Sequence, residues 1–218
     1  MEASGLSIPW AGLASGFPLG AARRDGHNPA MRIVSASLAA AIATILLLAS
    51  DPFADADQKD SRLPALFDQL KAAATAEEAK PVEMQIWSIW TASENAEVNR
   101  LMAEGTAAMS MQDPKTALED FTRIVEIAPD FAEGWNKRAT LFYLLGQFDA
   151  SMADIDHTLE LEPRHFGALS GLGLIQMMLE HDEQAVDAFE RALSIHPQMT
   201  GPRANIDVLK ERIKSKSI

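Results

Sequence analysis

The 218-residue chain contains no cysteine. This absence excludes disulfide bonds, thiolate metal sites, cysteine nucleophiles and a lipid-modified cysteine. It leaves the compartment open, because reducing and oxidising compartments both accept proteins without cysteine. Tyrosine occurs once and runs of β-branched residues are scarce, whereas leucine, alanine, isoleucine and methionine dominate an apolar fraction of 47%. These are helix-forming residues, so the composition predicts an all-α fold.

The chain also has few positive charges, and its formal net charge is −12. A surface of this sign repels nucleic acid and anionic lipid, so we expect neither to be the main partner. An acidic surface also keeps a protein soluble, which explains the charge without any partner.

Motifs that carry catalysis or bind cofactors are missing as well. The sequence has no glycine-rich phosphate loop, no His-Glu-x-x-His motif and no nucleophile elbow. We expect the histidines to be solvated residues on no shared face, and the acidic pairs Glu119-Asp120 and Asp154 with Asp156 to face solvent. The histidines concerned are His157, His165, His181 and His196. The sequence therefore predicts no enzyme, no cofactor, no metal site and no small-molecule substrate.

The N-terminal quarter has the outline of an export signal. Residues 1–30 show no helical or alternating period and predict no fold, as an unstructured or misassigned extension would. Met31-Arg32 is followed by an uncharged apolar run, Ile33–Ala49, and then by the small residues of Ala54-Asp55-Ala56. A basic start, an apolar stretch and small residues two apart are typical of a signal peptide. We predict a signal peptide over 31–56, cleaved after Ala56, and a periplasmic protein.

Two alternatives remain open for this segment. The 17-residue run Ile33–Ala49 is at the short end of a membrane-spanning helix, so it could be a retained anchor in the inner membrane with the rest of the chain outside the cytoplasm. The membrane is a partner only in that case. Because a signal normally begins the chain, we also expect translation to begin at Met31 rather than Met1.

A repeat carries most of the information in the remaining sequence. Three similar phrases end in Pro129, Pro163 and Pro197, which are 34 residues apart. A constant period of this size is typical of a solenoid built from identical two-helix units. The units are 98–131, 132–165 and 166–199.

Counted from the start of each unit, large and small residues recur at the same places. Small residues stand at positions 8 and 20, large ones at 4 and 24, and proline at 32. These are Leu101, Gly105, Ala117, Phe121 and Pro129 in the first unit, Trp135, Ala139, Ser151, Ile155 and Pro163 in the second, and Leu169, Gly173, Ala185, Phe189 and Pro197 in the third. Small residues at 8 and 20 allow two helices to approach to roughly 8–10 Å.

This pattern closely resembles the tetratricopeptide repeat (TPR), in which position 11 is usually aromatic and position 27 small. Phe142 fits position 11, whereas Ala108 and Gln176 depart from it, and Ile124 and Thr158 depart at position 27. We expect looser packing at those hairpins but the same fold. The resemblance implies a right-handed α-solenoid of three TPR hairpins.

Local signals place the helix ends. Asp113-Pro114 predicts an N-cap followed by proline at the first helical position, and Gly146 stands where a helix should end. Asp130 and Glu133 have the spacing of a capping box.

Both ends of the solenoid show features of caps. Within 200–218, a helix over about 202–214 has one apolar stripe and one polar face, as a terminal capping helix requires. Residues 57–94 predict an N-terminal helical hairpin, which we expect to pack on the first repeat, burying Trp87 and Trp90. An exposed surface formed by these two tryptophans is the alternative. Pro81 either begins the second helix of this hairpin or lies early in it.

The resemblance also implies a role and a site. TPR proteins are non-catalytic scaffolds that bind a protein or peptide in the concave groove lined by the first helix of each unit, commonly through positions 2, 5, 9 and 12. Carried over to this chain, the groove residues are Asn99, Met102, Thr106 and Met109, then Glu133, Asn136, Thr140 and Tyr143, then Gly167, Ser170, Leu174 and Met177. We expect a mildly apolar, methionine-rich groove with Asn136 and Tyr143 as its polar contacts, although the methionines could instead fill gaps between hairpins. Thioether side chains adapt to irregular partners such as a peptide or a helix.

One sub-function of the family can be tested on the sequence. Members that bind chaperone tails clamp a terminal carboxylate with lysine, asparagine and other basic side chains at five groove positions. Here those positions hold Met102, Thr106, Lys137, Gly167 and Gly171. The clamp is absent, so we do not expect a co-chaperone of that kind. We expect an envelope scaffold, or a membrane-anchored assembly factor if the apolar run is retained.

Overall fold

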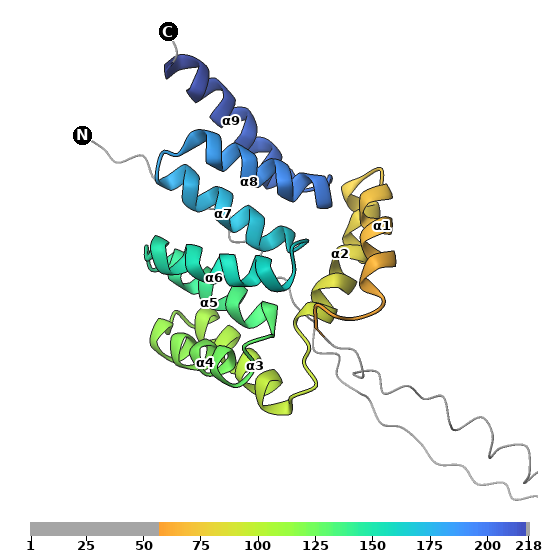
Figure 1. The fold of residues 1–218 in the computed structure, drawn as a ribbon, viewed down its shortest axis with the longest axis vertical. Coiled ribbons are helices and arrows are strands. Elements are labelled where there is room, and N and C mark those ends of the chain that lie inside the picture. Colours follow the sequence, from red (N-terminus) through yellow and green to blue (C-terminus); the bar gives the residue numbers. More distant parts are fainter. Residues whose placement is uncertain (1–56, 217–218) are drawn as a thin grey trace, which may run out of the picture. The chain divides into compact units, whose positions relative to one another are not determined.

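The computed structural model describes residues 57–216, and the regular secondary structure of this part of the chain is all α-helix (Figure 1). The predicted all-α fold class is confirmed. The helices are α1 (Leu63–Ala72), α2 (Ala76–Trp90), α3 (Ala96–Ser110), α4 (Pro114–Ile127), α5 (Ala132–Leu144), α6 (Phe148–Leu161), α7 (Phe166–Met178), α8 (Asp182–Ile195) and α9 (Thr200–Lys216). The predicted signal segment lies outside the described residues.

The three repeat units form helix pairs, α3 with α4, α5 with α6, and α7 with α8. Glycine at position 8 is required in two of these pairs because an aromatic ring lies against it. A Cβ atom on Gly105 would lie 2.7 Å from the ring of Phe121, and one on Gly173 would lie 2.5 Å from the ring of Phe189. Small residues at the crossing therefore set the distance between the helices, as predicted from their spacing.

The helix ends agree with two of the three predicted signals. The Asp113 carboxylate accepts a hydrogen bond from the Thr116 N–H at 3.2 Å, with Pro114 at the start of α4. Gly146 follows α5 with φ +70°, a left-handed conformation that favours glycine. The capping box of Asp130 and Glu133 is wrong, because α5 begins after Phe131 without a side-chain cap. The Glu133 carboxylate turns into the protein instead.

At the C-terminal end, α9 covers the last repeat as predicted. Ile206 and Leu209 are buried against the α8 side of the solenoid. Arg212 Nε lies 2.9 Å and Lys216 Nζ 3.0 Å from the buried Asp182 carboxylate at the start of α8. Apolar burial and two charged contacts thus fix α9 as the terminal cap.

The N-terminal hairpin forms, but it does not pack where we expected. Helix α2 begins at Ala76 behind the Thr75 cap, so Pro81 lies inside the helix. The apolar core of the hairpin includes Phe166 of α7, and α1 contacts α8. The hairpin therefore lies against the turns that join the repeats, where α7 begins and α8 ends, and not on the helices of the first repeat.

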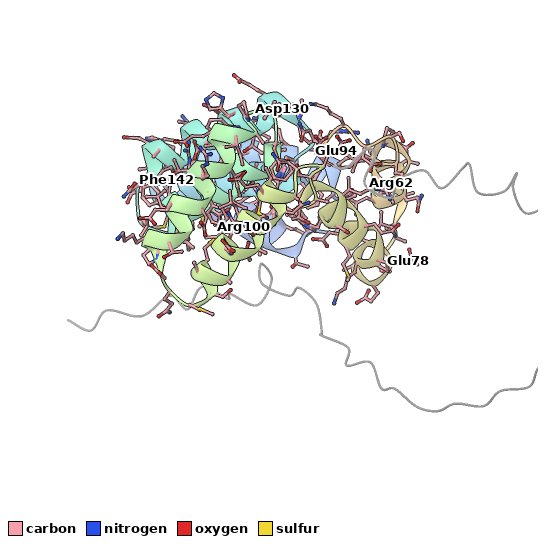
Figure 2. All side chains as sticks on the ribbon, turned by 90° about the horizontal axis from the view of Figure 1, so that it is seen from below. Arg62, Glu78, Glu94, Arg100, Asp130 and Phe142 are labelled. Carbon is pink, nitrogen blue, oxygen red and sulfur yellow. The ribbon has the colours of Figure 1, made fainter. Side chains whose placement is uncertain are left out.

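The exposed face of α3 explains this difference. Arg100, Ala103, Glu104 and Ala107 are all exposed there, and Arg100 forms an ion pair with Glu104 (Figure 2 labels Arg100). A face of charged and small side chains needs no cover from water. The apolar hairpin instead covers Phe166, which is 1% exposed.

Polar contacts hold the same docking position. Gln58 Nε2 donates to the backbone oxygen of Asp130 at 2.5 Å and Lys59 Nζ lies 2.7 Å from the Asp130 carboxylate. The Gln198 side chain donates to the backbone oxygen of Ala73 at 2.6 Å.

Within residues 57–216, no helix is long and apolar enough to cross a bilayer.

Candidate partner-binding surface

The predicted groove residues lie on the first helices of the repeats, and they differ in accessibility. Thr106 is exposed, and Met102 and Asn136 are buried. The half-buried ones are Asn99, Met109, Thr140, Tyr143, Ser170, Leu174 and Met177.

Met102 and Asn136 are corrected as contact residues because they are only 6% and 8% exposed. Asn136 is also not a free polar group, since its Nδ2 donates to Glu133 Oε2 at 2.9 Å. Asn99 likewise bonds to Ser93, accepting from its N–H at 2.9 Å and donating to its backbone oxygen at 2.6 Å. The accessible groove is narrower than the sequence predicted and lies toward the C-terminal halves of α3, α5 and α7.

A buried polar network occupies the opposite end of the groove. His165 is 0% exposed, and its Nδ1 accepts the Ala168 N–H at 3.0 Å. Its Nε2 therefore carries the proton that it donates to Glu133 Oε2, 3.0 Å away. Histidine is thus the N-cap of α7, and the expectation that His165 is a solvated turn residue is wrong.

The same network holds Glu133 as a carboxylate. Burial alone would raise its pKa, but Lys137 at 3.4 Å, His165 and Asn136 together hold the pKa of Glu133 below its ordinary value. The Lys137 charge thus faces a buried carboxylate of this chain.

The N-terminal hairpin covers this network. Trp90 stacks on His165 with ring centroids 4.2 Å apart. Trp87 lies over Gly167, where a Cβ atom would come within 2.8 Å of its ring. The tryptophans therefore cover the end of the groove where Glu133 is 1% exposed and Gly167 is half-buried. The sequence offered no signal for this, because it does not show where a non-repeating hairpin docks.

His196 is also buried, contrary to expectation, because the hairpin covers it. It is 3% exposed, and its Nε2 lies 3.4 Å from the Glu83 carboxylate of α2. Contacts with His196 and Trp87 hold the pKa of Glu83 below its ordinary value against the opposing effect of burial.

At the open end of the groove, the apolar side chains have one side in the core. Met109 packs against the first-repeat core, Met177 and Leu174 against the Phe189 core, and Tyr143 against Phe148 at a centroid distance of 6.0 Å. The methionines thus fill gaps and remain partly accessible.

Helix α9 carries an exposed residue at a groove position that the sequence analysis did not count. Thr200 is 34 residues after Phe166, so α9 continues the count as a first helix. Pro202 and Leu209 are buried at the same two positions as Ala168 and Ile175 of α7, which shows that α9 has the same orientation. Val208, at position 9, is 63% exposed and extends the row formed by Thr106, Thr140 and Leu174. Continuing the 34-residue count past Pro197 would have found it.

On α6, Asp154 is buried, which corrects the expectation that it faces solvent. It accepts two hydrogen bonds from Arg138, from Nε at 2.7 Å and from the terminal nitrogen at 2.8 Å. The Arg138 guanidinium also lies 5.0 Å from the centroid of the Trp135 ring. This pair joins α5 to α6 and belongs to the core of the second repeat.

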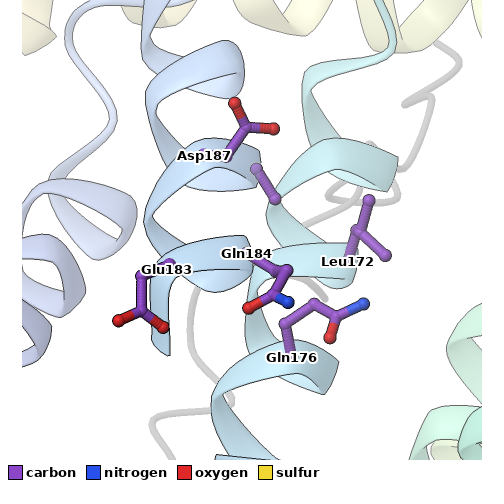
Figure 3. Close-up of a pocket in the computed structure, with 6 residues that line it drawn as sticks. Leu172, Gln176, Glu183, Gln184 and Asp187 are labelled. Carbon is purple, nitrogen blue, oxygen red and sulfur yellow. The ribbon is translucent and has the colours of Figure 1, made fainter. Parts of the chain in front are cut away.

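A hollow of about 420 Å³ lies beside α7 and α8 (Figure 3). Gln176 lines it at position 11, where the repeat pattern usually has an aromatic ring. Its amide contacts Met152 Sδ at 3.6 Å and His181 Nδ1 at 2.8 Å. None of the residues that line the hollow is a predicted groove residue.

No cluster of three or more acidic or histidine side chains in residues 57–216 could hold a metal ion.

No protein-family model matches the chain. A TPR repeat-containing protein of Rhizobium etli is 36% identical over 152 residues, which cover 70% of this chain and 74% of that protein. The chain belongs to the tetratricopeptide repeat proteins.

Solved TPR structures agree with this fold. The Sgt2 TPR domain from Aspergillus fumigatus matches with a TM-score of 0.53 and 22% identity, covering 56% of this chain and 83% of that domain. The first TPR of Spaghetti (RPAP3), bound to the HSP90 peptide SRMEEVD, matches with a TM-score of 0.53 and 18% identity, covering 54% of this chain and 94% of that one. At these identities the likeness concerns the fold. TPR proteins are interaction scaffolds, and this chain has their helix pairs.

Proposed function

We propose that this TPR protein is a non-catalytic scaffold that holds a segment of another protein along the accessible half of its groove. The observation that carries the proposal is the row of partly exposed side chains that recurs once in each unit and continues onto α9. The groove residues of the proposal are Thr106, Met109, Thr140, Tyr143, Ser170, Leu174, Met177 and Val208.

An acidic C-terminal tail is not the partner we propose. The only cation at the five clamp positions is Lys137, and it is paired with Glu133 at 3.4 Å. Trp87 covers Gly167 at another of these positions. A carboxylate bound there would lack the charge-assisted hydrogen bonds that such recognition needs.

Site-specific photo-crosslinking tests the groove. A photoreactive residue at Thr140 or Leu174 should crosslink a discrete partner in cells, whereas the same residue at Asp156, on the exposed face of α6, should not. Replacing both Tyr143 and Met177 with alanine should abolish the crosslink and leave helical content nearly unchanged. Equal crosslinking from Asp156, or a crosslink unaffected by the double variant, would reject the groove.

We further propose that the protein works in the cell envelope, exported by the segment 31–56. Support comes from the sequence alone, from the basic start, the run Ile33–Ala49 and the small residues that end at Ala56. N-terminal sequencing tests this proposal, and a mature protein that begins near Asp57 would support it. Fractionation after a high-salt wash separates a released periplasmic protein from a membrane-anchored assembly factor. A protein that keeps residues 1–30 and stays in the cytoplasm would contradict both.

A further inference from the structure

Each repeat has one turn between its two helices, and the three turns have the same backbone geometry. Each contains one residue in the left-handed region, at φ +59°, +70° and +60°, for Gln112, Gly146 and Glu180. In each turn this residue donates its N–H to the backbone oxygen of the residue three positions earlier. The donor–acceptor distances are 3.1 Å to Met109, 3.0 Å to Tyr143 and 3.3 Å to Met177. Because the turns match, side chains at equal positions leave the helices in the same direction and form rows along the stack.

The side chains just before these turns are large, apolar and exposed. They form what we call the turn row, and its members are Met111 (79% exposed), Leu144 (43%), Leu145 (40%) and Met178 (58%). Single exposed apolar residues are normal on proteins. Here each of the three stacked units has at least one of them in the two positions before its turn, with Leu144 and Met178 at position 13 and Met111 and Leu145 at position 14. The row stands one or two residues after Met109, Tyr143 and Met177, at the C-terminal ends of α3, α5 and α7.

Carboxylates border the turn row. Asp149, Glu180 and Glu183 are exposed, and none of the ion pairs formed within residues 57–216 includes them. Asp149 and Glu183 also suit the first turns of α6 and α8, whereas Glu180 lies in the turn itself, outside both helices.

The cations nearest in sequence or contact to these turns have other partners. Arg212 and Lys216 bind Asp182, and Lys115 lies 3.9 Å from Glu119. The unpaired charge at the second and third turns is therefore negative, in agreement with the net charge of −12.

We propose that the turn row docks a basic amphipathic helix of a partner protein. The apolar face of this helix would cover the turn row, and its lysine or arginine side chains would meet Asp149, Glu180 and Glu183. Since α5 contacts α7, the turns of the second and third repeats lie on the order of 10 Å apart. An α-helix rises that far in about seven residues, so a helix across the turns would present one apolar side chain per heptad to each turn. This inference rests on the proposed scaffold function and names the chemistry of its partner.

Synthetic peptides test the inference directly on the full-length purified chain. The probe is a fluorescent helical peptide of about three heptads with leucines on one face and lysines on both flanks. A second peptide has glutamate in place of every lysine, and a third has the first composition in scrambled order. We expect the lysine peptide to bind at least about tenfold more tightly than either control, and added salt to weaken its binding.

Variants assign the binding to this surface. Replacing Leu144 and Met178 with serine, or Asp149 and Glu183 with their amides, should each weaken binding of the lysine peptide at least about tenfold. Replacing Asp156 and Glu160, exposed on α6, with their amides changes the net charge equally and should leave binding unchanged. Circular dichroism confirms that each variant is folded.

Three results would overturn the inference: equal binding of the lysine and glutamate peptides, equal loss in the α6 control variant, and binding unaffected by the turn-row variants. Capture of phosphatidylcholine–phosphatidylglycerol vesicles that depends on Leu144 and Met178 would assign the row to a membrane and overturn it too. Partner crosslinking from Thr140 decides the scaffold proposal separately. A groove that crosslinks beside a turn row that fails these tests would leave the scaffold function in place and reject only the basic helix.

Discussion

Trp90 of α2 stacks on His165, the N-cap of α7, with the ring planes inclined by only 10°. The histidine joins two elements, because its other contacts go to Ala168 in α7 and Glu133 in α5. A hairpin outside the repeat pattern is thereby attached to the second and third repeats through one buried imidazole.

Removing the Trp90 ring should release the hairpin. Trp90 is 1% exposed and its indole N–H has no hydrogen-bond partner, so Trp90→Ala removes chiefly apolar packing. We expect a loss of about 3–5 kcal/mol in the free energy of unfolding, measured in urea, with faster proteolysis between α2 and α3. Trp90→Phe should cost less. Met84→Ala on the exposed side of α2 should change stability by less than about 0.5 kcal/mol, and an equal loss there would contradict the docking.

Stability should depend on pH through Glu133. Its pKa is lowered by folding from a reference value of 4.5, so its carboxylate stabilises the folded state above that pH. The stabilisation is lost as the pH falls through the lower folded-state pKa. Urea titrations between about pH 3 and pH 7 should show a shallower dependence for Glu133→Gln than for the wild type. Glu126→Gln, exposed on α4, is the matched control, and an equal effect there would show that the slope is not due to Glu133.

Two glycines should respond in opposite ways to alanine. Gly173→Ala places a methyl group 2.5 Å from the Phe189 ring and should destabilise the protein by about 1–3 kcal/mol. Gly201→Ala adds a methyl group in open space in α9 and should stabilise it by up to about 1 kcal/mol. Thermal unfolding measures both. Equal shifts of the same sign would contradict the close helix crossing.

The turn at Glu180 should gain stability from glycine. Glu180 has φ +60°, where a side chain is strained, so Glu180→Gly should stabilise the fold by roughly 1 kcal/mol. The same change should weaken binding of the lysine peptide, because it removes one of the bordering carboxylates. Gln112→Gly should stabilise similarly without that loss. A variant that binds the peptide more tightly as it becomes more stable would show that the side chain contributes nothing to docking.

The buried pair Arg138 and Asp154 should be sensitive to loss of one partner. Asp154→Ala leaves the guanidinium buried without its carboxylate and should cost about 3–5 kcal/mol. Replacing both residues with leucine should cost less, because no charge remains unpaired. Urea denaturation distinguishes the two, and a double variant less stable than the single one would show that the pair itself is strongly stabilising.

The repeat could be predicted from sequence because its determinants are local and periodic. Glycine opposite phenylalanine at Gly105 and Gly173 recurs with the period, and so do the prolines that end each unit. The hairpin was misplaced because its contacts span long separations and have no period. Trp90 and His165 are 75 residues apart, and nothing in their spacing indicates that they stack.

Part of the groove could be predicted, again because its positions recur with the repeat period. Positions counted by period placed Thr140, Tyr143 and Leu174 on the first helices, where they are partly accessible. Asn136 is buried because it bonds to Glu133, whose carboxylate turns inward to contact His165 at the end of the same repeat. Nothing in the sequence indicates that this carboxylate will turn inward. Met102 was assigned by position alone, without its neighbours.

The docked hairpin also changes the order in which parts of the protein should unfold. In a simple array each repeat is stabilised only by its neighbours, so unfolding begins at an end and proceeds unit by unit. Here residues 57–90 touch the chain near Asp130, at His165 and again near Gln198. These contacts couple the second repeat, the third repeat and the start of α9, so we expect these parts to unfold together. Helices α3 and α4 take no part in the contacts, and we expect them to unfold first.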